Sequence, residues 1–203
     1  MTVCNKSIEV LSAFPTIGKA DFVCKDVDHN SQAYNSTEKN FMTNSVQLRD
    51  ALETDLPIFY EQQLDPEAIQ MAAFPSRDHD AFMTHWGKTM ADDSVLIKTV
   101  LFNGNVAGNI VCFEQLGERE VGYWLGKEYW GKGIASQALT QFLDFIQTRP
   151  LYAHVAKQNI ASRRVLEKCG FKVAAEDKFF SKIFGKDIEE YILILNPNES
   201  INP

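Results

Sequence analysis

Between Glu120 and Ile146 the chain reads as a strand, a glycine-rich loop and a helix in direct succession. The first segment, Glu120 to Leu125, is short, apolar and aromatic, as buried strands are. Beyond the loop, apolar residues recur at spacings of three and four, which is typical of one face of an amphipathic helix. These residues are Ile134, Ala135, Ala138, Leu139, Phe142, Leu143 and Ile146. The segment therefore predicts a buried strand that leads through a tight loop into a packed helix.

The loop in this segment combines small residues with the start of a helix. Small residues let a ligand approach the backbone, and the exposed amides of a first helical turn, with the helix dipole, can hold a phosphate or pyrophosphate. A plain tight turn would explain the same pattern, because glycine-rich turns before helices are common. The predicted anion-binding residues are Trp130, Gly131, Lys132, Gly133, Ile134, Ala135 and Ser136.

Two well-known phosphate-binding motifs do not fit this loop. The Walker pattern requires Ser or Thr after its Gly-Lys pair, but Lys132 is followed by Gly133. The Rossmann pattern requires a third small residue, which Ser136 mimics only loosely. It also requires an acidic residue at the end of the next strand, and none stands between Tyr152 and Lys157. An ATP-binding or NAD-binding α/β domain is therefore disfavoured.

A second segment, Asn159 to Phe171, favours a ligand-binding role for the loop. It reads Asn-Ile-Ala-Ser-Arg-Arg-Val-Leu-Glu-Lys-Cys-Gly-Phe and resembles an Asn-x-x-Ser/Ala…Gly-Phe helix. Together the two segments resemble the GNAT N-acetyltransferase superfamily, and within it the branch of the ribosomal-protein N-terminal acetyltransferases. The coenzyme A loop of this family has the pattern Gln/Arg-x-x-Gly-x-Gly/Ala. Gly133 and Ala135 match its small positions, and Trp130 stands where Gln or Arg is usual.

The resemblance, which covers about residues 46 to 196, implies acetyl-CoA as the cosubstrate and no metal. The amides of Gly131 to Ser136 would cradle the pyrophosphate, and Lys132 would either add a charge or be simply solvated. Asn159 would contact coenzyme A while also capping its helix. The residues whose backbone would pair with the pantetheine arm are Tyr123, Trp124 and Leu125. The basic residues that would meet the 3′-phosphate, or remain solvated, are Arg163, Arg164 and Lys168.

Acetyl transfer to an amine needs a base for the amine, donors for the tetrahedral oxyanion, and a proton or hydrogen bond for the departing thiolate. The oxyanion donor is expected to be a backbone amide of the Trp124–Leu125 region. Many family members protonate the thiolate with a tyrosine of the second helix, but that position is Leu166 here. Ser162 is then the candidate, as in the ribosomal branch, although a small residue packed under the cofactor would fit equally well.

Two glutamates of the central strands, Glu114 and Glu120, are the candidates for the base, acting directly or through water. A solvent-facing strand carboxylate is the plainer interpretation of either residue. His85 and His154 are weaker candidates. His154 is the polar member of an otherwise apolar alternation, so we expect it to face outward.

Composition excludes several classes of protein. The net charge of −7 argues against a nucleic-acid partner. No apolar run approaches the ~18 residues of a membrane span, and no basic region followed by an apolar stretch opens the chain. The four cysteines lack metal-ligand spacing, and Cys112 and Cys169 fall among apolar neighbours, as buried reduced thiols do. We therefore expect a cytoplasmic protein that binds no metal, membrane or nucleic acid.

The order of the remaining elements predicts a mixed α/β sheet. Asn103-Gly104 is the strongest hairpin signal in the chain. With the resemblance, the order implies a single GNAT-like domain with a mixed, mostly antiparallel sheet flanked by helices. An exposed final strand would pair between subunits and form a homodimer. The expected strands are 45–49, 95–102, 106–113, 120–125, 151–156, 171–180 and 188–195; the expected helices are 55–64, 65–73, 78–91, 134–146 and 159–169. The residues expected to cap the first three of these helices are Thr54 or Asp55, Asp65, and Asp78 or Asp80.

Three parts of the chain are expected: an N-terminal extension of unknown role over 1–44, a GNAT-like N-acetyltransferase domain over 45–197, and a C-terminal tail over 198–203. The expected activity is direct acetyl transfer from acetyl-CoA to a primary amine of a small molecule or a peptide N-terminus. The alternative is a catalytically weak coenzyme A-binding sensor or interaction module, favoured by Leu166 and by the unassigned base. Polyamines, aminoglycosides, amino acids and protein N-termini remain open as acceptors, because the helices expected over 55–91 carry no acceptor motif.

Overall fold

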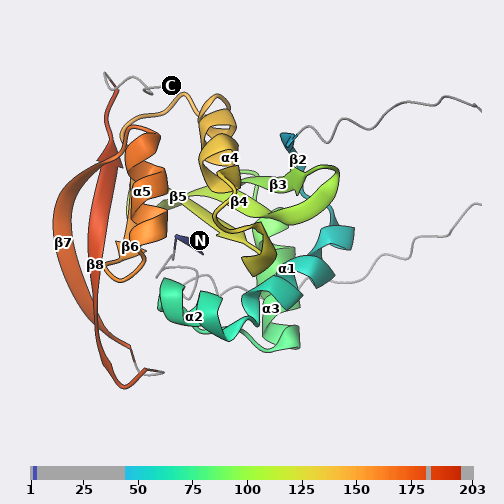
Figure 1. The fold of residues 1–203 in the computed structure, drawn as a ribbon, viewed down its shortest axis with the longest axis horizontal. Helices are drawn as coiled ribbons and strands as arrows, with labels where there is room; N and C mark the ends of the chain where they lie inside the picture. Colours follow the sequence, from blue (N-terminus) through green and yellow to red (C-terminus); the bar gives the residue numbers. More distant parts are fainter. Residues whose placement is uncertain (1, 4–43, 182–183, 198–203) are drawn as a thin grey trace, which may run out of the picture.

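A mixed β-sheet forms the centre of the molecule (Figure 1). The computed structural model describes residues 2–3, 44–181 and 184–197. The strands lie in the order β2-β3-β4-β5-β6-β8-β7, with β1 beside β5, and β5–β6 is the parallel pair among the described strands. The predicted mixed, mostly antiparallel α/β fold is confirmed. The strands are β1 (Thr2–Val3), β2 (Val46–Asp50), β3 (Leu96–Phe102), β4 (Asn105–Gln115), β5 (Glu118–Leu125), β6 (Leu151–Ala156), β7 (Lys172–Ser181) and β8 (Lys186–Leu195).

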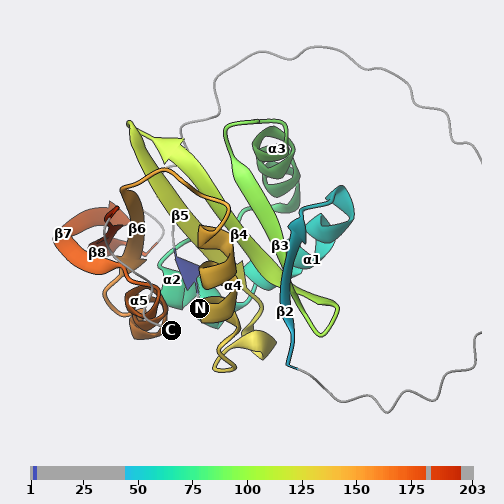
Figure 2. The same cartoon turned by 90° about the horizontal axis from the view of Figure 1, so that it is seen from above.

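Helices cover both faces of this sheet (Figure 2). In β5, Trp124 Nε1 donates to the carbonyl of Gln62 in α1 at 3.1 Å, and the Tyr123 hydroxyl donates to the carbonyl of Ser162 in α5 at 3.3 Å. Successive strand residues point to opposite faces, so α1 and its neighbour α3 lie on one face, while α5 and its neighbour α4 lie on the other. The helices are α1 (Leu56–Gln63), α2 (Pro66–Ala72), α3 (His79–Met90), α4 (Ile134–Leu143) and α5 (Ile160–Lys168), with short 3-10 turns η2 (Glu53–Asp55) and η3 (Lys127–Tyr129).

Helix starts follow the predicted capping residues in three cases out of the four described here. Asp65, Asp78 and Asn159 each accept a hydrogen bond from the amide three residues on, at 2.9, 2.8 and 3.1 Å. The side chain of Asp55, predicted to cap α1, makes no capping bond to that helix. Its carboxylate instead joins α1 to the sheet, because it accepts hydrogen bonds from Arg49 of β2 and from Thr99 of β3.

The apolar face of α4 fills the core between this helix and the sheet. The predicted core-facing residues are all buried, including Ile146 beyond the end of the helix. The helix ends at Leu143 rather than at the predicted Ile146. The amides of Phe145 and Ile146 bond to carbonyls three residues back, so the chain tightens into 3-10-like turns that keep Ile146 in the core.

Two further predictions concern strand pairing. The Asn103-Gly104 hairpin is confirmed, because both residues have positive φ, 51° and 80°, as a type I′ turn requires. The final strand, β8, is not an edge strand: it pairs with β6 on one side and β7 on the other. The prediction that the final strand is available to another subunit is therefore wrong, and the open edge on this side of the sheet belongs to β7 (Figure 1).

The N-terminal strand lies at the centre of the molecule (Figure 1). Thr2 pairs with Trp124 and Val3 pairs with Tyr123, antiparallel to β5, and β1 also lies against β6 and α2. The remainder of the predicted extension over 1–44 and the predicted tail over 198–203 fall outside the described residues, apart from Asn44. Within the described residues, no helix is long and apolar enough to cross a membrane.

Candidate active site

The strands β5 and β6 form a fork near the middle of the sheet. They run side by side and pair at Glu120 and Tyr152, with no further β5–β6 pair among the described residues. Beyond this point, the edge of β5 that faces β6 carries β1, paired at Tyr123 and Trp124. These are two of the three residues predicted to pair with pantetheine. A pantetheine arm bound along this edge would therefore take the place of β1.

The loop at the end of β5 enters α4 through two left-handed glycines. Gly133 is the N-cap of α4 with φ of 76°, and Gly131 has φ of 73°, where side chains other than glycine are strained. A Cβ built at Gly131 meets no atom within 4 Å, and one built at Gly133 meets only the Gln137 amide at 3.8 Å. The space beside the first turn of α4 is therefore open, which suits an anion held by backbone amides at a helix N-terminus.

Trp130 fixes the start of this loop to the end of β5. Its indole Nε1 donates to the carbonyl of Leu125 at 2.9 Å. The preceding residue, Tyr129, packs edge-on against Phe102 with ring centroids 6.3 Å apart. Trp130 thus holds the loop in shape at the position where the family pattern has Gln or Arg.

A pocket of about 210 Å³ lies between the loop, α4 and α5. Two of its walls carry groups suited to phosphates: the backbone at the start of α4, and the side chains of Arg164 and Lys168 on α5. The residues that line it are Leu125, Tyr129, Trp130, Gly131, Gly133, Ile134, Ala135, Ser136, Ala161, Arg164, Val165 and Lys168. The predicted loop residues other than Lys132 are thus brought together around one cavity.

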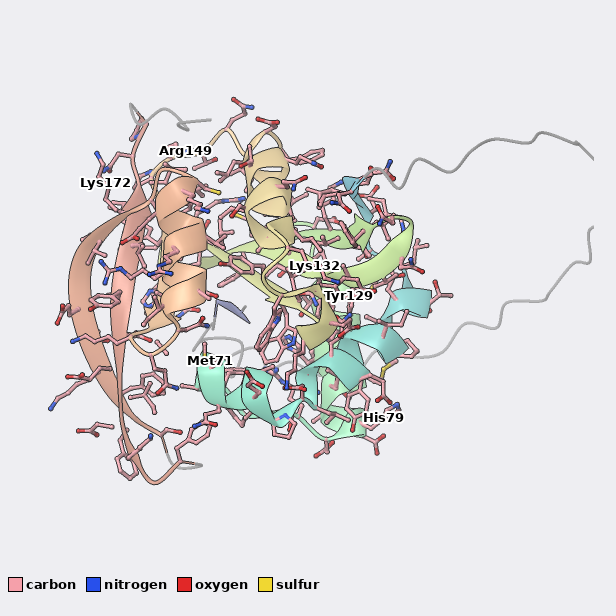
Figure 3. All side chains as sticks on the ribbon, in the orientation of Figure 1. Met71, His79, Tyr129, Lys132, Arg149 and Lys172 are labelled. Atoms are coloured by element: carbon pink, nitrogen blue, oxygen red, sulfur yellow. The ribbon has the colours of Figure 1, made fainter. Side chains whose placement is uncertain are left out.

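Two basic residues that were candidates for phosphate binding do not line this pocket. The Lys132 ammonium lies 6.0 Å from the ring centroids of Phe102 and of Tyr129, and Figure 3 shows Lys132 close to Tyr129. Arg163 forms an ion pair with Glu167 of its own helix, Nε to Oε1 at 2.7 Å. The cationic wall of the pocket is therefore made by Arg164 and Lys168.

The first turn of α5 contributes Ala161 to the pocket, whereas the predicted cofactor-binding residues Asn159 and Ser162 do not line it. Asn159 and Ser162 are both fully buried, and Asn159 accepts the hydrogen bond from the Ser162 amide. The hydroxyl of Tyr123 bonds to the backbone of Ser162. Burial raises the pKa of the Tyr123 phenol, so this hydroxyl stays protonated at neutral pH. Leu166, at the family's tyrosine position, is fully buried in the core.

On the face covered by α1 and α3, three ionisable side chains from adjacent strands lie in a row. His154 of β6 stands between Glu120 of β5 and Glu190 of β8: Nδ1 lies 3.0 Å from Glu190 Oε1, and Nε2 lies 3.8 Å from Glu120 Oε1. The exposed fractions of their side chains are 16% for His154, 7% for Glu120 and 4% for Glu190. We call these three residues the acidic row. His154 points away from the buried face of Ala153 and Val155, as the alternation predicts, but its side chain is only 16% exposed, because Glu120 and Glu190 flank it.

The two glutamates proposed as bases lie on opposite faces of the sheet. Glu114 pairs with Arg119, whereas Glu120 pairs with Phe113, and neighbouring positions along a strand alternate in direction. Glu114 is exposed near the β4–β5 turn, while Glu120 is buried at the fork. The structure therefore brings Glu120, and not Glu114, to the point where β5 and β6 separate.

Burial favours the uncharged form of three other titratable side chains, His85, Cys112 and Cys169. Burial lowers the pKa of His85 to about 4, and the charges of Arg77 and Lys88 act in the same direction, so His85 is neutral at pH 7. Burial raises the pKa of the Cys112 and Cys169 thiols, and both are free and buried, as predicted. Over the described ranges, no group of three or more His, Cys, Asp or Glu side chains is arranged to hold a metal ion.

Comparison with known proteins agrees with this arrangement. The family model for the acetyltransferase (GNAT) domain matches residues 45–172. The chain belongs to the GNAT acetyltransferase family. The matched range begins just before β2 and ends at the start of β7, so it contains both branches of the fork, the glycine loop, α4 and α5.

Two relatives from Bacillus subtilis (strain 168) carry acetyltransferase names. "Probable N-acetyltransferase YjcK" is 32% identical over 120 residues, which are 57% of this chain and 63% of YjcK. "Putative ribosomal N-acetyltransferase YdaF" is 26% identical over 124 residues, which are 57% of this chain and 68% of YdaF. A further relative, p20 of Bacillus licheniformis, is matched over 51% of its length. The matches to YjcK and p20 thus span less than two thirds of those proteins.

Solved GNAT structures share the fold. The spermidine N-acetyltransferase from Vibrio cholerae, solved with CoA and spermine, superposes with a TM-score of 0.68 at 19% identity, over 77% of this chain and 98% of that one. YncA from Salmonella typhimurium, solved with acetyl-CoA, gives a TM-score of 0.61 at 20% identity, over 78% and 98% of the two chains. At these identities the likeness shows the fold.

Two structural features near the fork were not predicted from the sequence. Glu190 lies in a strand that reads as plainly alternating, and only its buried contact with His154 distinguishes it. Gly108 of β4 was also missed: a Cβ there would lie 2.0 Å from the carbonyl oxygen of Trp124, so glycine is needed for β4 to approach β5 at the fork. A glycine inside the strand β4 is the one sequence signal for Gly108, and Glu190 has none.

Proposed function

We propose that the protein is an acetyl-CoA-dependent N-acetyltransferase that moves an acetyl group directly to a primary amine in a ternary complex. The observation that carries this proposal is the pocket of about 210 Å³ formed by the glycine loop and the first turns of α4 and α5. Membership of the GNAT family supports it. Two structural neighbours were solved with CoA or acetyl-CoA, which favours the same ligand here.

The pocket has the chemistry that this cosubstrate requires. Backbone amides of Gly131 to Ser136 would hold the pyrophosphate, and Arg164 and Lys168 would neutralise phosphate charge at the α5 wall. The edge of β5 at Tyr123 to Leu125 would pair with the pantetheine arm, and Asn159 would contact the cofactor at the start of α5. Acetyl-CoA supplies the activated thioester, and no metal is part of the proposal.

The acceptor amine would lose its proton to the acidic row. Glu120 is the sequence candidate that lies at the fork and is buried there, so we assign it the contact with the amine, direct or through one water. Glu114, the other candidate, is exposed on the opposite face and is the weaker choice. A backbone amide near Trp124 and Leu125 would donate to the oxyanion, and Ser162 would hydrogen-bond to the departing thiolate.

For the acceptor we propose a chemical class and no single molecule. Buried carboxylates beside the fork favour a cationic amine, either a small polyamine-like molecule or a peptide N-terminus. The names of the Vibrio cholerae neighbour and of YdaF, a spermidine and a ribosomal N-acetyltransferase respectively, justify testing both kinds. We also propose a cytoplasmic location, no membrane or nucleic-acid partner, and a homodimer that uses the open edge of β7.

A catalytically weak coenzyme A-binding sensor remains the second candidate. Leu166 and β1, which pairs along the edge proposed for pantetheine, favour it. Thiol release with Ellman's reagent separates the two. Acetyl-CoA is supplied with spermidine, kanamycin, lysine, or a peptide with a free serine N-terminus, and products are identified by mass spectrometry. Thiol release with an acetylated amine supports the transferase. Tight acetyl-CoA binding without release on any amine would favour the sensor.

A further inference from the structure

The edge of β5 that faces β6 is occupied by a segment of the chain itself. On its other edge, β5 pairs with β4 over its whole length, including Tyr123 and Trp124. β1 pairs with the same two residues, through Val3 and Thr2 respectively, so it must use the edge that β4 leaves open. β1 also lies against β6 and α2. It is therefore placed where β5 and β6 separate, at the centre of the molecule (Figure 1).

β1 runs in the direction that the pantetheine arm would take. The proposed pyrophosphate site follows the C-terminal end of β5, so the arm would run from Leu125 back toward Tyr123. β1 is antiparallel to β5 and passes Trp124 before Tyr123. β1 and the pantetheine arm would thus present their amides to the same edge of β5, over the same residues.

One edge of a strand pairs with one extended partner at a time. Each residue has a single backbone N–H and a single C=O, and those that point away from β4 are the groups available at this edge. Since β4 holds the opposite edge over Tyr123 and Trp124, a second partner at these residues has no other backbone groups to use. Pairing of β1 and pairing of the pantetheine arm are therefore mutually exclusive.

We propose that β1 is an intramolecular competitor of acetyl-CoA: it pairs with β5 in the free protein and leaves this edge when the cofactor binds. The proposal rests on the proposed function and adds a regulatory step to it. Residues 4–45 join β1 to β2, so the competitor is tethered and its effective concentration does not change with protein concentration. The apparent Kd for acetyl-CoA is then the intrinsic Kd divided by the fraction of molecules whose β5 edge is free.

The pairing of β1 is short, which suits a competitor that must leave. Its two residues provide few backbone hydrogen bonds, and each adds little net stability, because water competes for the same groups. The sheet does not depend on β1, since β5 stays paired with β4 from Glu118 to Leu125. Displacement of β1 therefore changes the occupant of the edge and leaves the rest of the sheet in place.

The first test removes the backbone donors of β1 in the intact chain. Proline has no backbone N–H, so Thr2→Pro/Val3→Pro should release β1 and lower the Kd for acetyl-CoA by about threefold or more. Thr2→Ala/Val3→Ala keeps both N–H groups and is the matched control, with a Kd within about twofold of the wild type. Isothermal titration calorimetry compares the three proteins. Equal Kd values for the proline variant and the wild type would overturn the proposal.

A shorter ligand distinguishes competition for the edge from a general change in the pocket. The nucleotide fragment of coenzyme A, 3′-phospho-ADP, carries the phosphates but lacks the pantetheine arm. It should bind the wild type and the proline variant equally, because it does not need the edge of β5. If this fragment gained as much affinity as acetyl-CoA in the proline variant, the proposal would be overturned, since β1 would then act on the pocket and not on the edge.

The second test follows β1 directly in the wild-type chain. Nitrogen-15 NMR of valine-labelled protein, with the Val3 amide assigned by Val3→Ala, reports whether this residue is held in the sheet. Saturating acetyl-CoA should move the Val3 signal to the sharp line of an unpaired chain, whereas 3′-phospho-ADP should leave it in place. A Val3 signal that is unpaired before any ligand is added, or that stays paired in the acetyl-CoA complex, would contradict the competition.

These tests separate the role of β1 from the proposed function. Acetyl-CoA binding with the same Kd in the wild type and in the proline variant would refute only the competition. Failure of both proteins to bind acetyl-CoA or CoA would refute the donor site itself, and the Val3 signal would still report the pairing of β1 with β5.

Discussion

The donor half and the acceptor half of the site are built in different ways. The donor half consists of a contiguous loop, the helix that follows it and one turn of α5, and its proposed ligands are largely backbone amides. The acceptor half that we propose would be assembled from side chains of β5, β6 and β8, with Glu120 and Glu190 far apart in the chain. A backbone site leaves a sequence signature of glycines and spacing, whereas a side-chain row between strands leaves almost none. Mutations in the donor half should therefore weaken acetyl-CoA binding, whereas mutations in the acceptor half should lower kcat without changing that binding.

The largest effect is expected from filling the donor pocket. Ala161 lines the pocket and is half-buried, so Ala161→Trp should occupy the space of the cofactor and weaken acetyl-CoA binding by about a hundredfold or more, or ~2.7 kcal/mol. Ile160→Trp places the same ring on the neighbouring residue, which is 56% exposed and outside the pocket, and should bind normally. Isothermal titration calorimetry compares the two. Equal affinities would mean that the pocket is not the donor site.

The next largest effect concerns the acceptor half alone. Glu120→Gln should lower kcat by about a hundredfold, because the amine loses its first contact for the proton, while acetyl-CoA affinity stays within about twofold. Glu114→Gln tests the other glutamate, which faces the opposite side of the sheet, and should change neither value. Steady-state kinetics and calorimetry on both variants are the measurement. A larger loss in Glu114→Gln would reverse the assignment of the base.

A third prediction concerns Asp55, which joins the start of α1 to the sheet. Burial opposes ionisation of Asp55, but hydrogen bonds from Arg49, Thr99 and the Leu52 amide outweigh it and lower the pKa from 3.8 to about 2. Asp55→Asn should reduce the free energy of unfolding by about 2 kcal/mol, since it breaks this partly buried pair.

The pH dependence follows from the depressed pKa of Asp55. Because the folded value lies below the unfolded one, the stabilisation is fully present above about pH 5 and is lost as the pH falls through about 2. Urea unfolding at several pH values should therefore show a constant difference between wild type and Asp55→Asn above about pH 5, which shrinks in acid. A difference that grows in acid would contradict this account. Acetyl-CoA affinity should not change.

The smallest expected effect concerns the two cations of the donor pocket, Arg164 and Lys168. Arg164→Ala and Lys168→Ala each remove a cation from the pocket wall and should raise the Kd for acetyl-CoA about three- to tenfold, with the effect reduced at high salt. Arg163→Ala is the matched control, because Arg163 is paired with Glu167 and lies outside the pocket. Calorimetry at two salt concentrations measures the series. An effect in Arg163→Ala equal to the others would mean that general helix charge, and not the pocket, attracts the ligand.

The sequence predicted the features that depend on residues close together in the chain, and it failed on those that depend on distant residues. Periodicity and turn residues predicted α4, α5, the Asn103-Gly104 hairpin and the caps at Asp65 and Asp78, because each depends on residues within a few positions. The glycine loop before α4 was predicted as well, and its ligand stays a prediction. Alternation predicted the direction of His154 but not its low exposure, because the carboxylates that flank it come from β5 and β8, far away in the sequence.

Long-range pairing accounts for the other errors. The final strand was expected at an edge, but the order β6-β8-β7 places it inside, and strand order depends on contacts between residues distant in sequence. Asp55 was interpreted as a local cap, whereas Arg49 and Thr99 bring its carboxylate to the sheet. The contact of Glu190 with His154 could not be predicted, because the two residues are 36 positions apart in the chain.

The most direct test of the account is whether acetyl-CoA binds the intact chain selectively. Thermal unfolding is measured with acetyl-CoA, CoA, ATP and NAD in parallel. At about 100 times its dissociation constant, a ligand of the folded state adds roughly 2.7 kcal/mol, which raises the Tm visibly. The account predicts a shift with acetyl-CoA and CoA alone, absent in Ala161→Trp and retained in Ile160→Trp. No shift with either thioester or thiol, or an equal shift with ATP and NAD, would contradict it.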